Sequence, residues 1–393
     1  MRVVLASRLF APEVAAAAFR LRALTTALTD AGHRVTVLTT RAPEGAGPPL
    51  ETVAQVRRWP VLRDRGGNVR GYAQYASFDI PLAGRLLVRR ADVVVCEPPP
   101  SSGVVVAAVC AVRRIPFHYY AADVWSDALV ASGAPGPVVA VMRALERATL
   151  RRAAGVLAVS DGVAERVVAL GARPERVEVV SNGIDTDVFS PAVDGSAADD
   201  PVLVYTGTMS EWQGADVFVR AMPEVLRRVP AARLVFLGQG SAERDLRELA
   251  GRLAPHAIEF RGVVPPVEAA RALRAARAAL VSIVPGRGYD FARPTKIYAA
   301  TACGTPVLFA GAGDAAALVR DNDLGVVADH DPAKVADQMV AMLTGATADP
   351  AHLVAWTEEN ASLRSTGRRA ARWVTGVGRL RRAPALRGSR RAA

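Results

Sequence analysis

The sequence predicts an α/β protein built as a pair of doubly wound, Rossmann-like domains facing a central cleft. Short apolar runs of strand length alternate with helical patterns over most of the 393 residues. Near-continuous apolar strands joined by helices are typical of a parallel sheet covered on both faces. One polar segment rich in small residues, 191–201, interrupts the alternation. We therefore expect an N-terminal domain over 1–190, a linker over 191–201 and a C-terminal domain over 202–360.

The N-terminal domain begins with a β-α-β unit. Residues 3–6 form an apolar run of strand length, and Phe19, Leu24, Leu28 and Ala31 follow at helical spacing. Gly32, just past the last of them, is typical of a helix C-terminus. The remaining strands of this domain are expected at 35–39, 93–96, 117–121, 156–159 and 177–180.

The C-terminal domain repeats the pattern behind the polar segment. Its strands are expected at 202–205, 234–237, 258–260, 280–284, 307–309 and 325–327. In open α/β sheets, ligands bind beyond the carboxyl ends of the strands. The residues that follow each strand are therefore the first candidates for a functional site.

The cysteine content, the length of the apolar runs and the charge distribution indicate the compartment and the partners to expect. Three cysteines without CxxC spacing predict buried thiols in a reducing compartment, and no apolar run reaches the ~20 residues of a membrane span. We expect a cytoplasmic protein. The net charge of +11 is uneven, because residues 1–190 hold 23 arginines against 17 acids, while 364–393 hold ten arginines and no acid. Basic surfaces attract phosphates of nucleic acids, anionic lipids or phosphorylated substrates.

The segment after the first strand excludes one common class of site. Residues 7–20 contain no glycine, whereas a dinucleotide-binding turn requires G-x-G-x-x-G. Four alanines, 15–18, have two interpretations: they favour a helix, or they leave room for a ligand at the helix N-terminus.

Arg293-Pro-Thr-Lys296 predicts an anion-binding helix start. Pro294 is expected at the first helical position, and Gly304 follows the last. The N–H groups of Thr295 and Lys296 would lie at the positive end of the helix. Lys296 is one of only two lysines, in a chain that otherwise uses arginine. We expect phosphate binding here, and the alternative is a surface lysine on a capped helix.

Single residues elsewhere leave alternatives open. Asp123 follows the strand at 117–121 and either points into the cleft or caps the next helix. Asp321-Asn-Asp323 looks like a metal-binding DxD, but we interpret it as a turn. The histidines lack paired metal-ligand spacing, and His118 is expected in the core or at the cleft edge.

A basic and aromatic stretch lies in the first domain. Its arginines (Arg57, Arg58, Arg63, Arg65 and Arg70) alternate with Trp59, Tyr72 and Tyr75. The stretch fits an interfacial membrane or acceptor surface, a platform for stacked bases, or a solvated charged face. We expect a membrane or acceptor surface and no nucleic-acid partner.

The sequence resembles the GT-B glycosyltransferases, and within them the retaining family 4. Phe10-Ala-Pro-Glu13, Arg20 and the segment 31–37 resemble the family's "PPE…R…GHEVTV" opening. The segment 92–99 and Ala122-Asp-Val-Trp125 match its next landmarks, and 180–191 resembles its "VS…NGVD…F.P" run. Further matches follow in the family's order: 205–207, 213–214, 237–240, 260–263, 294–298 and 304–307.

The resemblance implies transfer of a hexose-type sugar from a nucleotide diphosphate sugar, most often a UDP-sugar, with retention and without a metal or other cofactor. It implies that Thr295 and Lys296 meet the diphosphate, that the backbone at Gly262 and Val263 meets the nucleobase, and that Asp123 lies near the reacting sugar. Ala16, Ala17 and Arg20 are expected on the acceptor side. The acceptor is expected to be lipid-linked, a polysaccharide or a natural product.

The sequence departs from the family at four positions. Thr208 and Gln213, beside Gly214, stand where the family usually has two phosphate-binding cations. Arg287, Arg293 and Lys296 are expected to compensate. Phe291 and Ala299 stand where the family has the two glutamates of its E-x7-E pair. Asp290 is expected to substitute for the first. These losses motivate one alternative, a weak or inactive homologue that serves as partner of another transferase. The tail, 361–393, either crosses back to the first domain with Trp373 as its anchor or extends as a basic segment.

Overall fold

The chain folds into two compact units. The computed structural model describes residues 1–13, 15–43, 53–64, 69, 71–131, 133–191, 200–345 and 348–380. Unit 1 comprises Met1–Val159, Val163–Val180 and Thr366–Ala393, and unit 2 comprises Ser160–Gly162 and Ser181–Ser365. Most of the expected linker, 192–199, lies outside the described residues, so that expectation stays a prediction.

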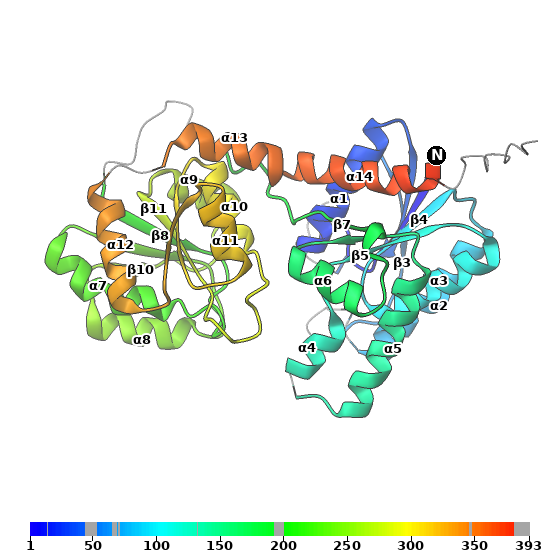
Figure 1. Cartoon of the computed structure of the whole chain (residues 1–393), viewed down its shortest axis with the longest axis horizontal. Helices are drawn as coiled ribbons and strands as arrows, with labels where there is room; N and C mark the ends of the chain where they lie inside the picture. Colours follow the sequence, from blue (N-terminus) through cyan, green and yellow to red (C-terminus); the bar gives the residue numbers. More distant parts are fainter. Residues whose placement is uncertain are drawn as a thin grey trace, which may run out of the picture. The chain divides into compact units, whose positions relative to one another are not determined.

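Unit 1 is a parallel sheet of seven strands covered by helices on both faces (Figure 1). The strand order is β3-β2-β1-β4-β5-β6-β7. The strands are β1 (Arg2–Ala6), β2 (Arg34–Thr40), β3 (Gln55–Trp59), β4 (Val93–Cys96), β5 (Phe117–Ala121), β6 (Gly155–Ala158) and β7 (Val177–Val179). The helices are α1 (Ala16–Asp30), α2 (Tyr72–Val88), α3 (Pro100–Arg113), α4 (Trp125–Ala131), α5 (Gly136–Arg152) and α6 (Asp161–Ala169), with a 3-10 turn at Pro174–Arg176.

The two faces of this sheet carry separate cores. One core joins apolar residues of α2, α3, α5 and α6 to the sheet, and the other joins the sheet to α1 and to α14 (Leu363–Leu380). α14 is the first part of the arginine-rich tail, and it contributes Ala370, Ala371 and Val374 to this core. Trp373 packs beside them, so this part of the chain packs on the sheet of unit 1.

Unit 2 is a second parallel sheet, of six strands in the order β10-β9-β8-β11-β12-β13. The strands are β8 (Val202–Thr206), β9 (Arg233–Leu237), β10 (Ile258–Phe260), β11 (Ala278–Ser282), β12 (Val307–Ala310) and β13 (Gly325–Ala328). α7 (Asp216–Arg228), α8 (Glu243–Leu253) and α12 (Pro332–Thr344) cover one face. α9 (Pro266–Arg274), α10 (Thr295–Ala302), α11 (Asp314–Asp321) and α13 (Pro350–Asn360) cover the other.

This architecture confirms the predicted pair of doubly wound α/β domains and indicates which loops to consider as ligand sites. Each sheet reverses its strand order once, between β1 and β4 in unit 1 and between β8 and β11 in unit 2. Ligands of such sheets bind at the carboxyl ends of the strands beside the reversal. The loops that follow these four strands are therefore the structural candidates for function.

Some sequence expectations need correction. β3 lies within the basic stretch that was interpreted as a surface segment. β11 begins and ends two residues earlier than the strand expected at 280–284. Phe19 was expected on the buried face of α1, but 40% of it is exposed. Pro294 is the N-cap of α10 and Thr295 its first residue, so the proline lies one position earlier than expected.

Other expectations hold. The three cysteines are free and buried, and burial raises their pKa values well above the usual range. His118 lies in the core, where burial lowers its pKa to about 4. Asp321 ends α11 and Asp323 adopts a φ of 52°, which confirms the expected turn. Among the described residues, no helix is long and apolar enough to cross a membrane.

Candidate functional site

The start of α10 presents unpaired N–H groups at the strand-order reversal of unit 2. Pro294 caps the helix with a φ of −62° and has no N–H, and no side chain caps the helix N-terminus. The first N–H groups that point out of the helix belong to Thr295 and Lys296. Because the positive end of the helix dipole lies here, an oxyanion at this point is favoured.

Lys296 is partly buried against the loop that follows β8. Its Nζ donates to the carbonyl oxygen of Thr208 at 3.1 Å and lies 3.9 Å from the ring centroid of Tyr205. Desolvation lowers the pKa of its ammonium group to about 7. In the described part of the chain no carboxylate pairs with this ammonium, so an approaching anion would find a cation held in place but not neutralised.

Thr208 contributes its backbone to this arrangement. Its carbonyl oxygen accepts from Lys296 and also from the phenol of Tyr205, at 2.9 Å. Gly207, at φ 91°, precedes it, and a Cβ there would lie 3.6 Å from Cε of Lys296. The loop after β8 therefore lies in van der Waals contact with the lysine, and the positive φ of Gly207 disfavours any L side chain there.

The loop after β9 rests on the loop after β8, backbone against backbone. A Cβ on Gly238 would lie 2.0 Å from the carbonyl oxygen of Gly207, and one on Gly240 would lie 2.1 Å from that of Met209. The amide of Gly207 donates to Leu237 at 2.6 Å, and that of Met209 to Gln239 at 3.0 Å. Gly238 and Gly240 are therefore needed for close packing of the two loops.

Replacing Gly238 by alanine is expected to destabilise unit 2 by at least about 2 kcal/mol, because the Cβ overlaps a backbone oxygen and the φ of 136° disfavours any L side chain. Thermal unfolding measures the loss. The matched control is Gly251→Ala, in the interior of α8 with open space around it, which is expected to stabilise by about 0.5–1 kcal/mol. Equal melting temperatures for the two variants would contradict the assignment.

Gln213 and Gly214 are placed differently from the expectation. Gln213 is buried, and its Oε1 accepts from the amide of Ser210 at 3.1 Å, which ties the loop to itself. A Cβ on Gly214 would lie 2.3 Å from Val284 and 2.6 Å from Nε2 of His330. That histidine nitrogen lies 2.9 Å from the carbonyl oxygen of Gly214. Both residues therefore shape the loop, and the expectation that they bind the donor stays a prediction.

Gly262 and Val263 lie in the open. Gly262 has a φ of 70° with nothing within 4 Å of an added Cβ, and 67% of Val263 is exposed. The carbonyl oxygen of Gly262 accepts from Gly238 at 2.7 Å, which ties this turn to the loop after β9. The backbone of the turn is accessible, as the resemblance implies for a nucleobase.

The segment before α10 shows why the missing glutamates are not replaced directly. Both oxygens of Asp290 accept from the amide of Gly286, at 3.2 and 3.3 Å, so this carboxylate closes its own loop. Phe291 is exposed, whereas Ala299 is buried in the core of unit 2. Arg293 lies partly buried two residues before α10. These hydrogen bonds therefore do not support the expectation that Asp290 substitutes for the first missing glutamate.

In unit 1, Asp123 lies beyond the carboxyl end of β5 and does not cap α4. The amides of Trp125 and Ser126 are capped by Oε1 of Glu146, at 2.7 and 3.4 Å. Desolvation raises the pKa of the Asp123 carboxyl group, and the charge of Arg20 opposes this rise. Glu146 thus takes the capping role, which leaves the Asp123 carboxylate available for another function.

Arg20 and Glu97 form a buried ion pair that the sequence did not reveal. Nη2 of Arg20 lies 3.0 Å from Oε2 of Glu97, and both side chains are about 95% buried. The hydroxyl of Ser7 donates to Oε1 of Glu97 at 2.5 Å, which joins the loops after β1 and β4. The guanidinium also covers the ring of Tyr120 at 4.8 Å. The only sequence signal for this pair is the position of Glu97 directly after a strand.

The other expected residues of unit 1 fall into two groups. Ala16 and Ala17 are the first two residues of α1, with no side chain capping its N-terminus, so small side chains line this helix start. Arg58 donates to the carbonyl oxygens of Ala11 and Thr40, and Arg63 pairs with Glu13 at 3.5 Å. Those two arginines stabilise loops and are not free surface cations, which corrects the expectation. Arg57 is exposed, while Arg65 and Arg70 lie outside the described residues.

Two aromatic residues that sequence reasoning missed stack at the carboxyl edge of unit 2. Trp212, in the loop after β8, and Tyr289, in the loop after β11, have ring centroids 4.4 Å apart with an interplanar angle of 21°. The amide of Val284 donates to the carbonyl oxygen of Trp212 at 2.9 Å. The pair therefore joins the two loops on either side of the strand-order reversal.

Comparison with known proteins gives matches along most of the chain. The family model described as Glycosyltransferase Family 4 matches residues 17–188, and the model described as Glycosyl transferases group 1 matches 200–345. A D-inositol 3-phosphate glycosyltransferase of Acidothermus cellulolyticus is 34% identical over 191 residues, which are 44% of this chain and 42% of that protein.

Two further similarities are informative. A GDP-mannose-dependent alpha-(1-6)-phosphatidylinositol monomannoside mannosyltransferase of Mycolicibacterium smegmatis is 30% identical over 53% of this chain and 58% of its own length. HepE of Anabaena, solved in complex with UDP, has a TM-score of 0.62 at 16% identity and covers 97% of this chain and 98% of its own. The chain spans about half the length of the curated relatives that it matches. The structural match supports the GT-B fold.

Proposed function

Because the chain belongs to glycosyltransferase family 4, we propose that it transfers a hexose-type sugar from a nucleotide diphosphate sugar to an acceptor hydroxyl, with retention of configuration and without a metal. The observation that carries the proposal is the cluster at the start of α10. There, the ammonium of Lys296 and the amides of Thr295 and Lys296 meet at the strand-order reversal of unit 2.

In this proposal the cluster stabilises the departing diphosphate. Negative charge builds up on the phosphate oxygens as the bond to the sugar breaks, and preorganised donors lower the energy of that state. Helix amides and one ammonium group supply such donors without a bound cation. The accessible backbone at Gly262 and Val263 would receive the nucleobase.

We propose uridine as the nucleoside. HepE, the structural neighbour, was solved with UDP and with UDP-glucose, whereas one curated relative is named for GDP-mannose. Asp123 is proposed to hold the reacting sugar, since its carboxylate is free of the capping role and lies at the carboxyl edge of its sheet. Two relatives are named for inositol phosphate or phosphatidylinositol acceptors, which supports a phosphorylated or lipid-linked acceptor here.

Calorimetric titration of the full chain with a panel of UDP-, GDP-, ADP- and dTDP-sugars tests the proposal. We expect saturable binding of at least one UDP-sugar at submillimolar concentration. Absence of binding by every donor at millimolar concentration would contradict it and would favour the alternative of a non-catalytic partner protein. Tighter binding of a GDP-sugar than of any UDP-sugar would show that the donor nucleoside is guanosine and would not contradict the proposed sugar transfer.

The pKa of Lys296 gives this binding a characteristic pH dependence. In the protein without ligand, the ammonium group of Lys296 has a pKa of about 7. A bound diphosphate stabilises the charged form of this group, so binding at pH 8 is expected to take up close to one proton. Affinity for UDP-glucose should fall above pH 7, by up to about tenfold per pH unit. Calorimetry in two buffers of different ionisation enthalpy measures the uptake.

Lys296→Arg serves as the matched variant for this measurement, since a guanidinium stays charged throughout this range. It is expected to bind without proton uptake. Uptake that persists in this variant would show that another group titrates.

We propose, separately, that unit 1 docks on an anionic membrane surface through β3 and α2. Trp59 and Arg57 of β3 are exposed, and so are Ile80 and Val88 of α2, with 72% and 84% of their surfaces accessible. Arg85 covers the Trp59 ring at 5.8 Å, which keeps a cation beside the aromatic group. Apolar and aromatic groups among arginines are typical of interfacial segments.

Sedimentation with vesicles tests this docking. The full chain is expected to pellet with anionic vesicles and not with neutral ones, and Ile80→Asp combined with Arg57→Gln should reduce pelleting at least fivefold. The segment 364–393 contains ten arginines, five of which follow residue 380, so the comparison is repeated with a chain ending after residue 380. Pelleting that is unchanged by the double substitution, in either chain length, would exclude β3 and α2 as the docking surface.

A further inference from the structure

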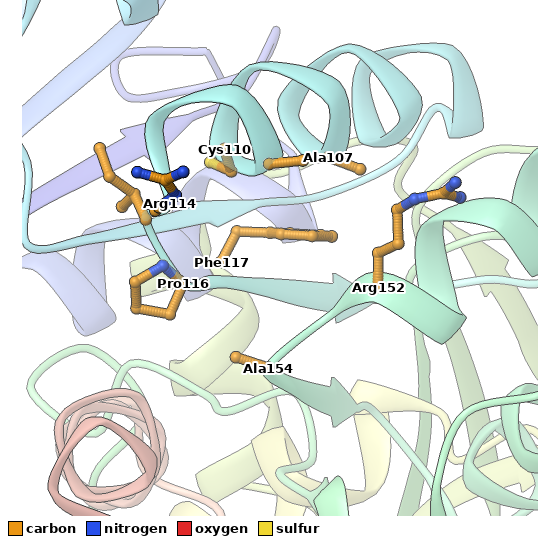
Figure 2. A pocket seen from close by; sticks show the side chains of 9 residues that line it. Ala107, Cys110, Arg114, Pro116, Phe117, Arg152 and Ala154 are labelled. Carbon is orange, nitrogen blue, oxygen red and sulfur yellow. The ribbon is translucent and has the colours of Figure 1, made fainter. Parts of the chain in front are cut away.

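A cavity of about 420 Å³ opens in unit 1 at the amino-terminal edge of its sheet, between the C-terminal ends of α3 and α5. Figure 2 shows Arg114 and Arg152 on opposite sides of Phe117, with Ala107 and Cys110 of α3 beside them. The lining residues are Ala107, Cys110, Ala111, Arg114, Ile115, Pro116, Phe117, Arg152 and Ala154. Its volume lies in the range of small-molecule sites, which is roughly 300–1,000 Å³.

The lining combines an apolar floor with two cations. Phe117, Cys110, Ala107 and Ala154 are buried and apolar, and none of the nine lining residues is acidic. In the described part of the chain, the guanidinium of Arg114 has no hydrogen bond or ion pair. Arg152 donates only to the carbonyl oxygen of Ala148, one turn back in its own helix, at 3.1 Å. Both positive charges therefore remain unneutralised at the mouth of an apolar cavity.

The backbone of Arg114 adds a second observation. This residue ends α3 in the left-handed conformation, with a φ of 54°, where glycine is strongly preferred. A cation at a helix C-terminus is favoured by the helix dipole, but Arg113 already supplies one, because it donates to the carbonyl oxygens of Leu86 and Arg89. The dipole therefore does not explain why an arginine also occupies the strained position at the cavity.

We propose that this cavity binds a phosphate monoester with an apolar body, its phosphate held between Arg114 and Arg152 and its apolar part on Phe117. A phosphate dianion matches two guanidinium groups in charge and offers oxygens for bidentate contacts. The site is separate from the proposed transfer site. Phe117 begins β5 and Asp123 lies beyond its other end, so the strand places the two roughly 13 Å or more apart.

Titration of the full chain with n-hexyl phosphate tests the site, with inorganic phosphate and hexanol as partial probes. Hexyl phosphate is expected to bind at least ten times more tightly than either. Arg114→Gly and Arg152→Gln are each expected to weaken it at least tenfold. Arg114→Gly should keep or raise the melting temperature, since glycine suits a φ of 54°, so loss of binding cannot be ascribed to unfolding. Ala111→Phe, on the exposed side of α3, should fill the opening and abolish binding.

Arg34→Gln is the matched control, an exposed arginine at the amino-terminal edge of the same sheet, and it should bind like the wild type. Saturating UDP should leave hexyl phosphate affinity unchanged, which separates this site from the proposed donor site. Displacement of hexyl phosphate by UDP, or wild-type affinity in Arg114→Gly and Arg152→Gln, would overturn the proposal. Failure of every nucleotide sugar to bind would contradict the proposed function and leave this site standing.

Discussion

Lys296→Ala is expected to lower the affinity for UDP by about 100-fold or more in the proposed donor site. The substitution removes a desolvated cation at the start of α10, and charge-assisted contacts of this kind contribute about 2–3 kcal/mol each. The fold should survive, because the carbonyl oxygen of Thr208 keeps its second hydrogen bond, from Tyr205. Calorimetric titration with UDP measures the loss.

The chain offers an unusually clean control for this prediction. Lys334, the only other lysine, is exposed on α12 of the same unit. Lys334→Ala changes the net charge by the same amount and should leave UDP affinity within about twofold of the wild type, as expected for an exposed charge. If both variants bind equally well, the start of α10 does not hold the diphosphate, and the proposed function loses its central observation.

Asp123→Asn is expected to reduce turnover by about 1,000-fold while UDP affinity stays within about twofold. The asparagine keeps the shape of the side chain but removes the charge proposed to act on the reacting sugar, and single electrostatic contacts in active sites have effects of this size. Release of UDP from a bound UDP-sugar, by transfer to an acceptor or to water, provides the rate. The binding titration in parallel separates catalysis from affinity.

Asp127→Asn is the control for this second variant. Asp127 lies four residues further along, in α4, where it forms an exposed ion pair with Arg166 at 2.6 Å. Exposed pairs contribute at most about 1 kcal/mol to stability, so this variant should retain near wild-type turnover. A rate for Asp123→Asn within threefold of that for Asp127→Asn would remove Asp123 from the mechanism.

The strands were predictable because burial leaves a local trace in the sequence. A strand covered on both faces must be apolar at nearly every position, as in Val93–Cys96 and Phe117–Ala121, whose bounds agree with the prediction. β3 was not predicted because it is an edge strand, in which the exposed Arg57 and Trp59 alternate with half-buried residues. An edge position is a property of the sheet, and no local pattern encodes it.

The candidate site was predictable only in part, for the same reason. Pro294-Thr-Lys296 is a local signal of a helix start, so its position could be inferred. Asp123 was ambiguous because the competing cap, Glu146, lies 21 residues away from the amide that it accepts from. Arg20 and Glu97 are 77 residues apart and pair only in the folded sheet.

The glycines after β9 have a role that the sequence pattern alone does not reveal. Leu237-Gly-Gln-Gly240 supported the family resemblance, and glycines in such turns are often linked to phosphate contacts. Their role here is steric, because Gly238 and Gly240 let one loop lie directly on the backbone of another. Only the coordinates of both loops separate these two explanations.

The return of α14 to the first sheet has a consequence for biosynthesis. On the ribosome, residues 1–180 emerge first, yet one face of their sheet is completed by residues that follow Thr366. At a translation rate of roughly 5–20 residues per second, the last helix of unit 1 is synthesised about 10–40 s after residue 180. By then all strands and helices of unit 2 have been synthesised. The half that is translated first is therefore the half that finishes folding last, and during that interval an apolar face beside α1 is a natural client for chaperones.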